Sequence, residues 1–193
     1  LNPLLIKEVF NAGHMELVLV LTLLLTLAVL RRGMHKPAGV FLGLATGAKL
    51  WPVLWLPFLL RGTATSIWRR LAVALAFLGP AALLALPVAL GRLDPQSGFT
   101  AYAQRWQMND SAYLLAHELA KLIWLEEAQL IARLMVGALL LGVMAVAWRY
   151  IRSGYEGFVS SAAAITIALL LLSPTQFPWY YLWVLPLLAL RPM

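Results

Sequence analysis

Residues 37–60 read PAGVFLGLATGAKLWPVLWLPFLL, an apolar run in which Lys49 is the one charged residue. The run is long enough to cross roughly 30 Å of membrane hydrocarbon as a helix. A lysine at that depth costs several kcal/mol unless it reaches water, a counter-ion or a ligand. We therefore take Lys49 as the leading candidate for a functional residue. The alternative is that its ammonium group simply snorkels to the membrane surface from a helix end.

The composition as a whole indicates a membrane protein. Of the 193 residues, 62% are hydrophobic and 12% are charged, about half the charged fraction of a soluble domain. Further continuous apolar runs occupy about 17–30, 71–90, 128–148, 158–172 and 179–190, whereas the strands of membrane barrels alternate apolar and polar residues. We expect an all-α fold, a polytopic transmembrane helical bundle with about six to seven membrane helices, in a single domain over residues 1–193. The absence of cysteine excludes disulfides and thiol chemistry.

The net charge of +7 is concentrated between the apolar runs. Most of the 15 lysines and arginines stand there, namely Arg31, Arg32, Lys36, Arg61, Arg69, Arg70, Arg149, Arg152 and Arg191. Of the 8 acidic residues, Glu156 alone lies near them. This is the positive-inside pattern, so we expect a multi-pass protein of the plasma membrane with these residues in the cytoplasm. Because the pattern accounts for the basic charge, we predict no nucleic-acid partner.

Both flanks of the run 37–60 are basic, and this favours a broken helix. A single straight span would separate Arg61, Arg69 and Arg70 from the other basic residues. Two short helices joined near residues 49–52 would keep both flanks on the cytoplasmic side. Pro52 removes a helical hydrogen bond and disfavours helix at Trp51, and broken helices are tolerated in membranes where protein or a cavity surrounds them. We predict the hairpin, with Lys49 at its tip on the non-cytoplasmic side.

The same topology gathers other polar and aromatic residues on the side of Lys49. Lysine is a compact cation suited to phosphate, and aromatic rings suit a sugar face or a lipid chain, although they also form the ordinary aromatic belt of membrane proteins. The pair His14 and Glu16 is too short a pattern to indicate a metal site. Asn109, Asp110 and Ser111 are expected to cap a helix that follows them.

Three stretches carry a further pattern. The first reads NPLLIKE over residues 2–8 and NAGHME over 11–16, the second reads GLATGAKLWP over 43–52, and the third reads SP at 173–174 and FPWYYLWVLP over 177–186. In this order they resemble motifs of integral-membrane glycosyltransferases of the GT-C fold. The group they resemble most is the polyprenyl-phosphate-mannose-dependent mannosyltransferases of glycosyltransferase family 87.

The resemblance implies transfer of a sugar, expected to be mannose, from a polyprenyl-phosphate donor to a hydroxyl of a glycan or glycolipid acceptor at the outer membrane face. It makes Lys49 the donor-phosphate residue. The sugar or acceptor pocket would contain Lys7, Glu8, Asn11, His14 and Glu16. The groove for the lipid-linked donor would contain Gln176, Trp179 and Tyr180. The resemblance implies no certain cofactor and leaves a divalent metal ion open, and we assign no metal ligand.

Two departures from the family pattern matter. Glu16 stands where an aspartate is expected, and the first outer loop, which usually holds the catalytic carboxylate, would precede Leu1. We therefore expect a C-terminal fragment that lacks the N-terminal helices and that loop, is inactive alone, and contains no assignable catalytic base. The alternatives are a transporter or flippase of a polyprenyl-linked sugar, which also needs a broken helix with a charged tip, and a scaffold subunit without chemistry.

Overall fold

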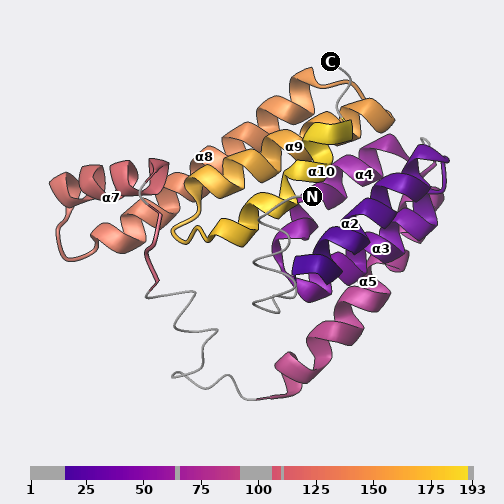
Figure 1. The fold of residues 1–193 in the computed structure, drawn as a ribbon, viewed down its shortest axis with the longest axis horizontal. Coiled ribbons are helices and arrows are strands. Elements are labelled where there is room, and N and C mark those ends of the chain that lie inside the picture. Colours follow the sequence, from indigo (N-terminus) through magenta and orange to yellow (C-terminus); the bar gives the residue numbers. More distant parts are fainter. Residues whose placement is uncertain (1–15, 64–65, 92–105, 110, 191–193) are drawn as a thin grey trace.

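The computed structural model describes residues 16–63, 66–91, 106–109 and 111–190, and every regular element in these ranges is helical (Figure 1). The α-helices are α2 (Glu16–Arg31), α3 (His35–Ala48), α4 (Leu56–Gly62), α5 (Ile67–Leu90), α7 (Ala112–Ile123), α8 (Ala128–Tyr150), α9 (Tyr155–Leu172) and α10 (Leu185–Leu190). The 3-10 helices are η2 (Trp51–Trp55) and η3 (Pro178–Trp183). The predicted all-α class is confirmed.

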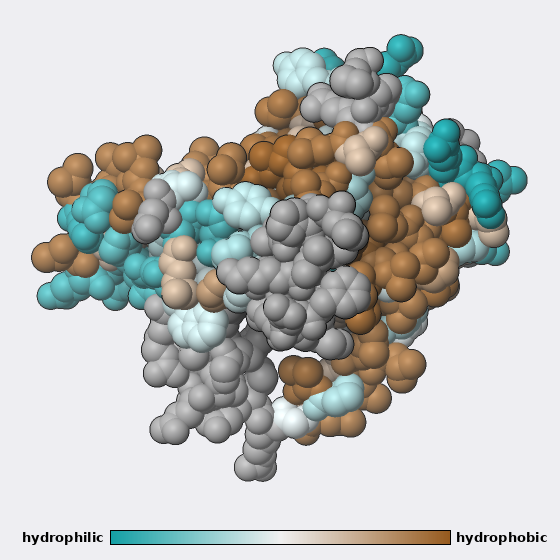
Figure 2. Space-filling model, viewed as in Figure 1, coloured by the Kyte–Doolittle hydropathy of each residue, from teal (hydrophilic) through white to brown (hydrophobic). Residues whose placement is uncertain are grey.

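Three helices in the described ranges, α5, α8 and α9, are long and apolar enough to cross a membrane. Shorter apolar helices complete the bundle. The surface of the long helices is apolar, as the exposed side chains of Leu75, Leu83 and Leu134 illustrate. Figure 2 shows this apolar surface over the middle of the molecule, with hydrophilic side chains gathered toward its ends. Such a distribution suits contact with lipid, where no water is available to solvate charged groups.

The predicted helical hairpin is present. Helix α3 ends at Ala48, and Lys49 has extended backbone angles of φ −149° and ψ 139°. The chain then returns through η2 and α4, in which Pro52 and Pro57 occupy the first turns, where a missing N–H costs little. It reverses again into α5, which runs in the same direction as α3. A single straight span over 37–60 is therefore excluded.

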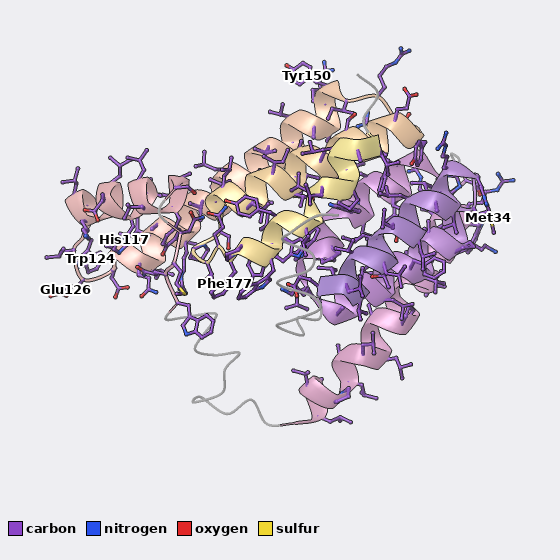
Figure 3. The ribbon with its side chains drawn as sticks, in the orientation of Figure 1. Met34, His117, Trp124, Glu126, Tyr150 and Phe177 are labelled. Atoms are coloured by element: carbon purple, nitrogen blue, oxygen red, sulfur yellow. The ribbon has the colours of Figure 1, made fainter. Side chains whose placement is uncertain are left out.

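The hairpin brings the basic segments to one end of the molecule. Arg61, at the end of α4, lies against Trp148 at the end of α8. Met34, in the turn between α2 and α3, and Tyr150 both lie away from Phe177, which is toward the other end (Figure 3). Charge placement along the sequence thus predicted correctly which helix ends lie together.

Helices α3 and α5 approach each other closely because α3 presents glycine every four residues. A Cβ atom on Gly39 would lie 2.7 Å from the carbonyl oxygen of Val73, and one on Gly43 would lie 2.2 Å from that of Phe77. These distances are too short for any real side chain, so the two backbones are in direct contact at these points. Small residues at four-residue spacing permit such packing between membrane helices.

Helix α9 packs against the hairpin at the centre of the main core. Trp55 of η2 is fully buried, and its indole N–H donates a hydrogen bond of 3.2 Å to the hydroxyl of Thr166 on α9. Its ring also makes an edge-to-face contact with Phe158, at 5.8 Å between centroids. A polar contact at this depth fixes the rotation of the hairpin relative to α9, because the buried indole N–H of Trp55 would otherwise have no acceptor.

The capping prediction for the segment before α7 is tested at Asn109 and Ser111 only, because Asp110 lies outside the residues that the structure describes. Ser111 precedes α7 but makes no side-chain hydrogen bond to it. Instead, the side-chain amide of Asn109 donates hydrogen bonds to the carbonyl oxygens of Leu170, Leu171 and Ser173. These carbonyls lie at the end of α9, where helical partners run out. The Asn109 side chain also accepts hydrogen bonds from the backbone N–H and the hydroxyl of Ser111, so it joins the C-terminal end of α9 to the residue before α7.

Candidate functional site

Lys49 lies at the tip of the hairpin, where it meets Glu16. Gly33, with φ +74°, turns the chain between α2 and α3, so the start of α2 and the end of α3 lie side by side at the opposite end. There the Lys49 ammonium donates a hydrogen bond to the carboxylate of Glu16. The Glu16 side chain is 3% exposed and that of Lys49 is 28% exposed. The counter-ion that a lysine at this depth requires is thus a buried glutamate.

Aromatic rings form the other side of the Lys49 environment. The Lys49 Nζ lies 4.4 Å from the centroid of the Tyr180 ring and 4.9 Å from that of Trp183. These two rings stack at 4.1 Å, and Trp51 stacks on Trp183 at 4.9 Å. Ring faces carry negative potential and attract cations. The ammonium group is therefore held between one carboxylate and two ring faces.

The structure brings together three of the predicted site residues, Glu16, Lys49 and Tyr180, from three separate elements. The other two predicted groove residues lie in the same C-terminal segment but make different contacts. Gln176 donates a hydrogen bond of 2.9 Å to the Tyr181 hydroxyl. Trp179 stacks on Phe177 at 4.5 Å. The remaining predicted residues, Lys7, Glu8, Asn11 and His14, lie outside the residues that the structure describes.

The sequence-based site omitted Trp183 and Trp51. A signal for Trp183 was available, because a 3-10 helix has three residues per turn and so places Tyr180 and Trp183 on one face. Trp51 stands two residues after Lys49, but nothing in the sequence indicated that its ring would stack on a residue from the far end of the chain. Both tryptophans contribute to the enclosure of the ammonium group.

The site retains hydrogen-bonding capacity. The Lys49 ammonium has three donors, and Glu16 is the hydrogen-bond acceptor that it meets within the described ranges. Among the residues that the structure describes, the buried indole N–H groups of Trp51 and Trp183 also have no acceptor. An oxygen-rich anion would complement the donors of the Lys49 ammonium that Glu16 does not use. The arrangement suits a phosphate group next to an aromatic-bound sugar or lipid.

The described residues do not offer a metal site. In residues 16–63, 66–91, 106–109 and 111–190, no three His, Asp or Glu side chains gather into a group able to hold a metal ion. Glu16 is already engaged by Lys49. We therefore derive no step of the chemistry through a metal.

A second group of ionisable residues lies on α7, apart from Lys49. Lys121 Nζ lies 2.7 Å from the Glu118 carboxylate, and His117 Nδ1 lies 3.9 Å from it. The hydrogen bond from Lys121 lowers the pKa of Glu118, with smaller contributions from the charges of Lys121 and His117. Figure 3 shows His117, Trp124 and Glu126 together at the far end of the molecule. These contacts are typical of the solvated face of an amphipathic helix.

Residues 4–174 match glycosyltransferase family 87, and the chain belongs to this family. The match includes Glu16 and Lys49, and it ends before the aromatic residues of η3. No curated protein and no solved structure shows significant similarity to the chain. Family and fold together define an integral-membrane glycosyltransferase, which acts on a sugar donor and an acceptor in a membrane environment.

Proposed function

We propose that this glycosyltransferase transfers a sugar, with mannose the expected one, from a polyprenyl-phosphate donor to a hydroxyl group of a glycan or glycolipid. The reaction would take place at the non-cytoplasmic face of the plasma membrane, opposite the basic end of the bundle. The observation that supports this proposal most directly is the position of Lys49. Its ammonium lies at the tip of a membrane hairpin, between Glu16 and the rings of Tyr180 and Trp183.

In the proposed reaction the acceptor oxygen bonds to the anomeric carbon of the sugar. The bond from that carbon to the phosphate oxygen breaks, and its electron pair leaves with the polyprenyl phosphate. The acceptor proton passes to a base, to which we assign no residue. The ammonium of Lys49 would stabilise the negative charge that develops on the leaving phosphate, and this stabilisation is strong where water is excluded.

Glu16 and the rings would prepare Lys49 for this role. The carboxylate fixes the direction of the ammonium, which keeps two further donors for phosphate oxygens. The ring faces hold the cation without using any of its hydrogen bonds. Aromatic rings also suit the apolar face of a sugar or the first units of a lipid chain. Membership of a glycosyltransferase family favours transfer over flipping of the same donor.

The test is sugar transfer in membranes that contain the full-length protein, with labelled polyprenyl-phosphate-mannose as donor. Lys49→Gln should lower transfer by about 10²-fold or more, as loss of one group that stabilises developing charge does in other enzymes. Lys36→Gln, which changes a lysine at the opposite end of α3, should transfer at the wild-type rate. Equal transfer by both variants would remove Lys49 from the donor site. If the protein transfers sugar from polyprenyl-phosphate-glucose and not from polyprenyl-phosphate-mannose, the proposed sugar is wrong. If it transfers sugar from neither lipid, the proposed class of donor is overturned.

A further inference from the structure

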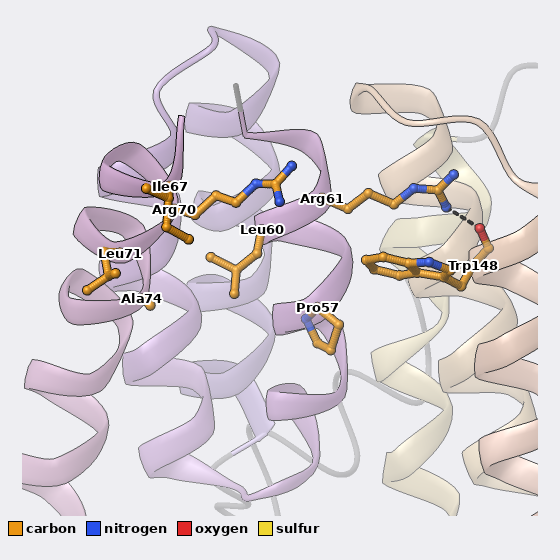
Figure 4. A pocket seen from close by; sticks show the side chains of 8 residues that line it. All are labelled: Pro57, Leu60, Arg61, Ile67, Arg70, Leu71, Ala74 and Trp148. Atoms are coloured by element: carbon orange, nitrogen blue, oxygen red, sulfur yellow. Dashed lines mark hydrogen bonds between the residues drawn. The ribbon is translucent and has the colours of Figure 1, made fainter. Parts of the chain in front are cut away.

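A groove lies at the basic end of the molecule, far from Lys49. It has a volume of about 380 Å³ and lies between α4, the start of α5 and the end of α8 (Figure 4). The volume falls within the usual range for pockets that bind small molecules, roughly 300 to 1,000 Å³. Two arginines, Arg61 and Arg70, lie on its rim, and its walls are apolar. No part of the proposed transfer reaction uses this groove.

Arg61 is held in place by Trp148. Its guanidinium donates a hydrogen bond of 2.5 Å to the Trp148 carbonyl oxygen and lies 4.9 Å from the centroid of the indole ring. The carbonyl and the ring face fix the position of the guanidinium but supply no full negative charge to neutralise it. Figure 4 shows Arg61 and Arg70 extending along the same edge of the groove.

The positive charge of the groove is not neutralised within the described ranges. Ion pairs among residues 16–63, 66–91, 106–109 and 111–190 involve Lys49, His117 and Lys121, and none reaches Arg61 or Arg70. Arg69 lies next to Arg70 and is exposed. Two guanidinium groups on one rim can each make bidentate hydrogen bonds to a phosphate.

The walls below the arginines are suited to hydrocarbon. Leu60, Leu71 and Ala74 line the groove, and Leu71 is 44% exposed. Trp148 is 46% exposed, and Trp68, which follows the lining residue Ile67 in the sequence, is 77% exposed, as expected for residues at the level of lipid head groups. A free phosphate ion would gain nothing from this apolar wall, whereas a phospholipid would cover it with an acyl chain.

We propose that this groove binds an anionic phospholipid, with the phosphate of its head group on Arg61 and Arg70 and the upper part of an acyl chain on Leu60 and Leu71. The positive-inside rule assigns the basic end to the cytoplasmic leaflet, where anionic lipids give the membrane surface its negative potential. Basic pockets between membrane helices on that side are suited to such head groups. The bound lipid would join α4, α5 and α8 at the base of the hairpin that carries Lys49.

The test is lipid retention by the purified full-length protein, measured by native mass spectrometry with phosphatidylglycerol and with phosphatidylcholine of the same chain length. The wild-type protein should retain phosphatidylglycerol in preference to phosphatidylcholine. Arg70→Gln should lower its affinity about fivefold, and the Arg61→Gln/Arg70→Gln double variant should lower it further, since each basic residue near an anionic lipid surface contributes about that factor. The control is Arg32→Gln, which removes an exposed arginine from the same end of the molecule but not from the groove.

Arg70→Gln leaves the contact between Arg61 and Trp148 intact, so a folded variant is expected, and its unfolding temperature is measured alongside. Equal retention of the two lipids by wild type would overturn the proposal. So would an equal loss of phosphatidylglycerol in Arg70→Gln and Arg32→Gln, because binding would then be general attraction to a basic surface. Displacement of phosphatidylglycerol by inorganic phosphate at similar concentration would show an anion site without lipid specificity, and would also overturn it.

Discussion

The ammonium group of Lys49 is bonded to the carboxylate of Glu16, so that the end of α3 is tied to the start of α2. The contact lies in an otherwise apolar region, in which the leucines of α2 pack on α3. A charged pair in such surroundings stabilises the fold little in comparison with an apolar pair, but loss of one partner leaves the other buried and uncompensated. The contact therefore fixes the end of α3 against the start of α2, and loss of either partner should destabilise the fold.

Removal of Lys49 should destabilise the protein through Glu16. We expect Lys49→Met to cost about 1 to 3 kcal/mol, the usual cost of a buried acceptor left without its donor, and Lys49→Met combined with Glu16→Gln to cost less than the sum of the two single changes. The measurement is thermal unfolding in detergent, analysed as a double-mutant cycle. Lys36→Met, at the opposite end of α3, is the matched control. A cycle in which the two costs add would show that the pair is not coupled.

The rings around Lys49 should contribute through their faces rather than through hydroxyl groups. Tyr180→Phe keeps the ring face toward Lys49 and should leave the donor KM nearly unchanged. Tyr180→Leu removes it and should raise the donor KM roughly 2- to 30-fold, the range that corresponds to one cation–π contact. Steady-state transfer assays on the two variants separate these cases. A larger effect of Tyr180→Phe than of Tyr180→Leu would contradict the assignment.

The contact between α3 and α5 should not tolerate a methyl group at Gly43. The added Cβ would lie 2.2 Å from the Phe77 carbonyl oxygen and 2.8 Å from the ring of Pro80. Because backbone must move to accommodate it, Gly43→Ala should destabilise the protein by about 1 to 3 kcal/mol. Gly79→Ala, on α5 with open space around the position, is the control and should be neutral or slightly stabilising. The measurement is the unfolding temperature of each variant, and equal temperatures for the two would show that the contact at Gly43 tolerates a methyl group.

The hydrogen bond between Trp55 and Thr166 should be detectable as a stability difference between two small substitutions. Thr166→Val keeps the shape but leaves the buried indole N–H of Trp55 without an acceptor, at a cost of about 1 to 3 kcal/mol. Thr166→Ser keeps the hydroxyl and should cost less. Chemical or thermal unfolding in detergent compares them. If the Thr166→Val variant is as stable as the Thr166→Ser variant, the hydrogen bond does not hold the hairpin to α9.

The hairpin was predictable because its causes are local. Basic residues on both flanks and a proline after Lys49 favour a chain that turns back at this point. The helical class followed from the long apolar runs in the same way. These signals lie within a few residues of the features they determine.

The partners of Lys49 were only partly predictable, because they come from distant segments. Glu16 and Tyr180 were candidates, but their contact with Lys49 depends on how three elements pack. Trp183 was overlooked although the 3-10 spacing places it beside Tyr180. The contacts of Asn109 with α9 were not predicted for the same reason, since the nearby helix start was visible in the sequence and the distant end of α9 was not.

The length of α3 sets the depth of the charge in the bilayer. Its 14 residues rise about 21 Å, and its first residue, His35, lies with the basic residues of one membrane surface. With His35 at one edge of a hydrocarbon layer of about 30 Å and α3 along the membrane normal, Lys49 would stand roughly 9 Å below the far edge. A donor phosphate in the proposed reaction would then have to descend below the head-group plane to reach the ammonium group. One extra helical turn, about 5.4 Å, would lift the ammonium toward the open surface, where water would weaken its hold on the leaving group.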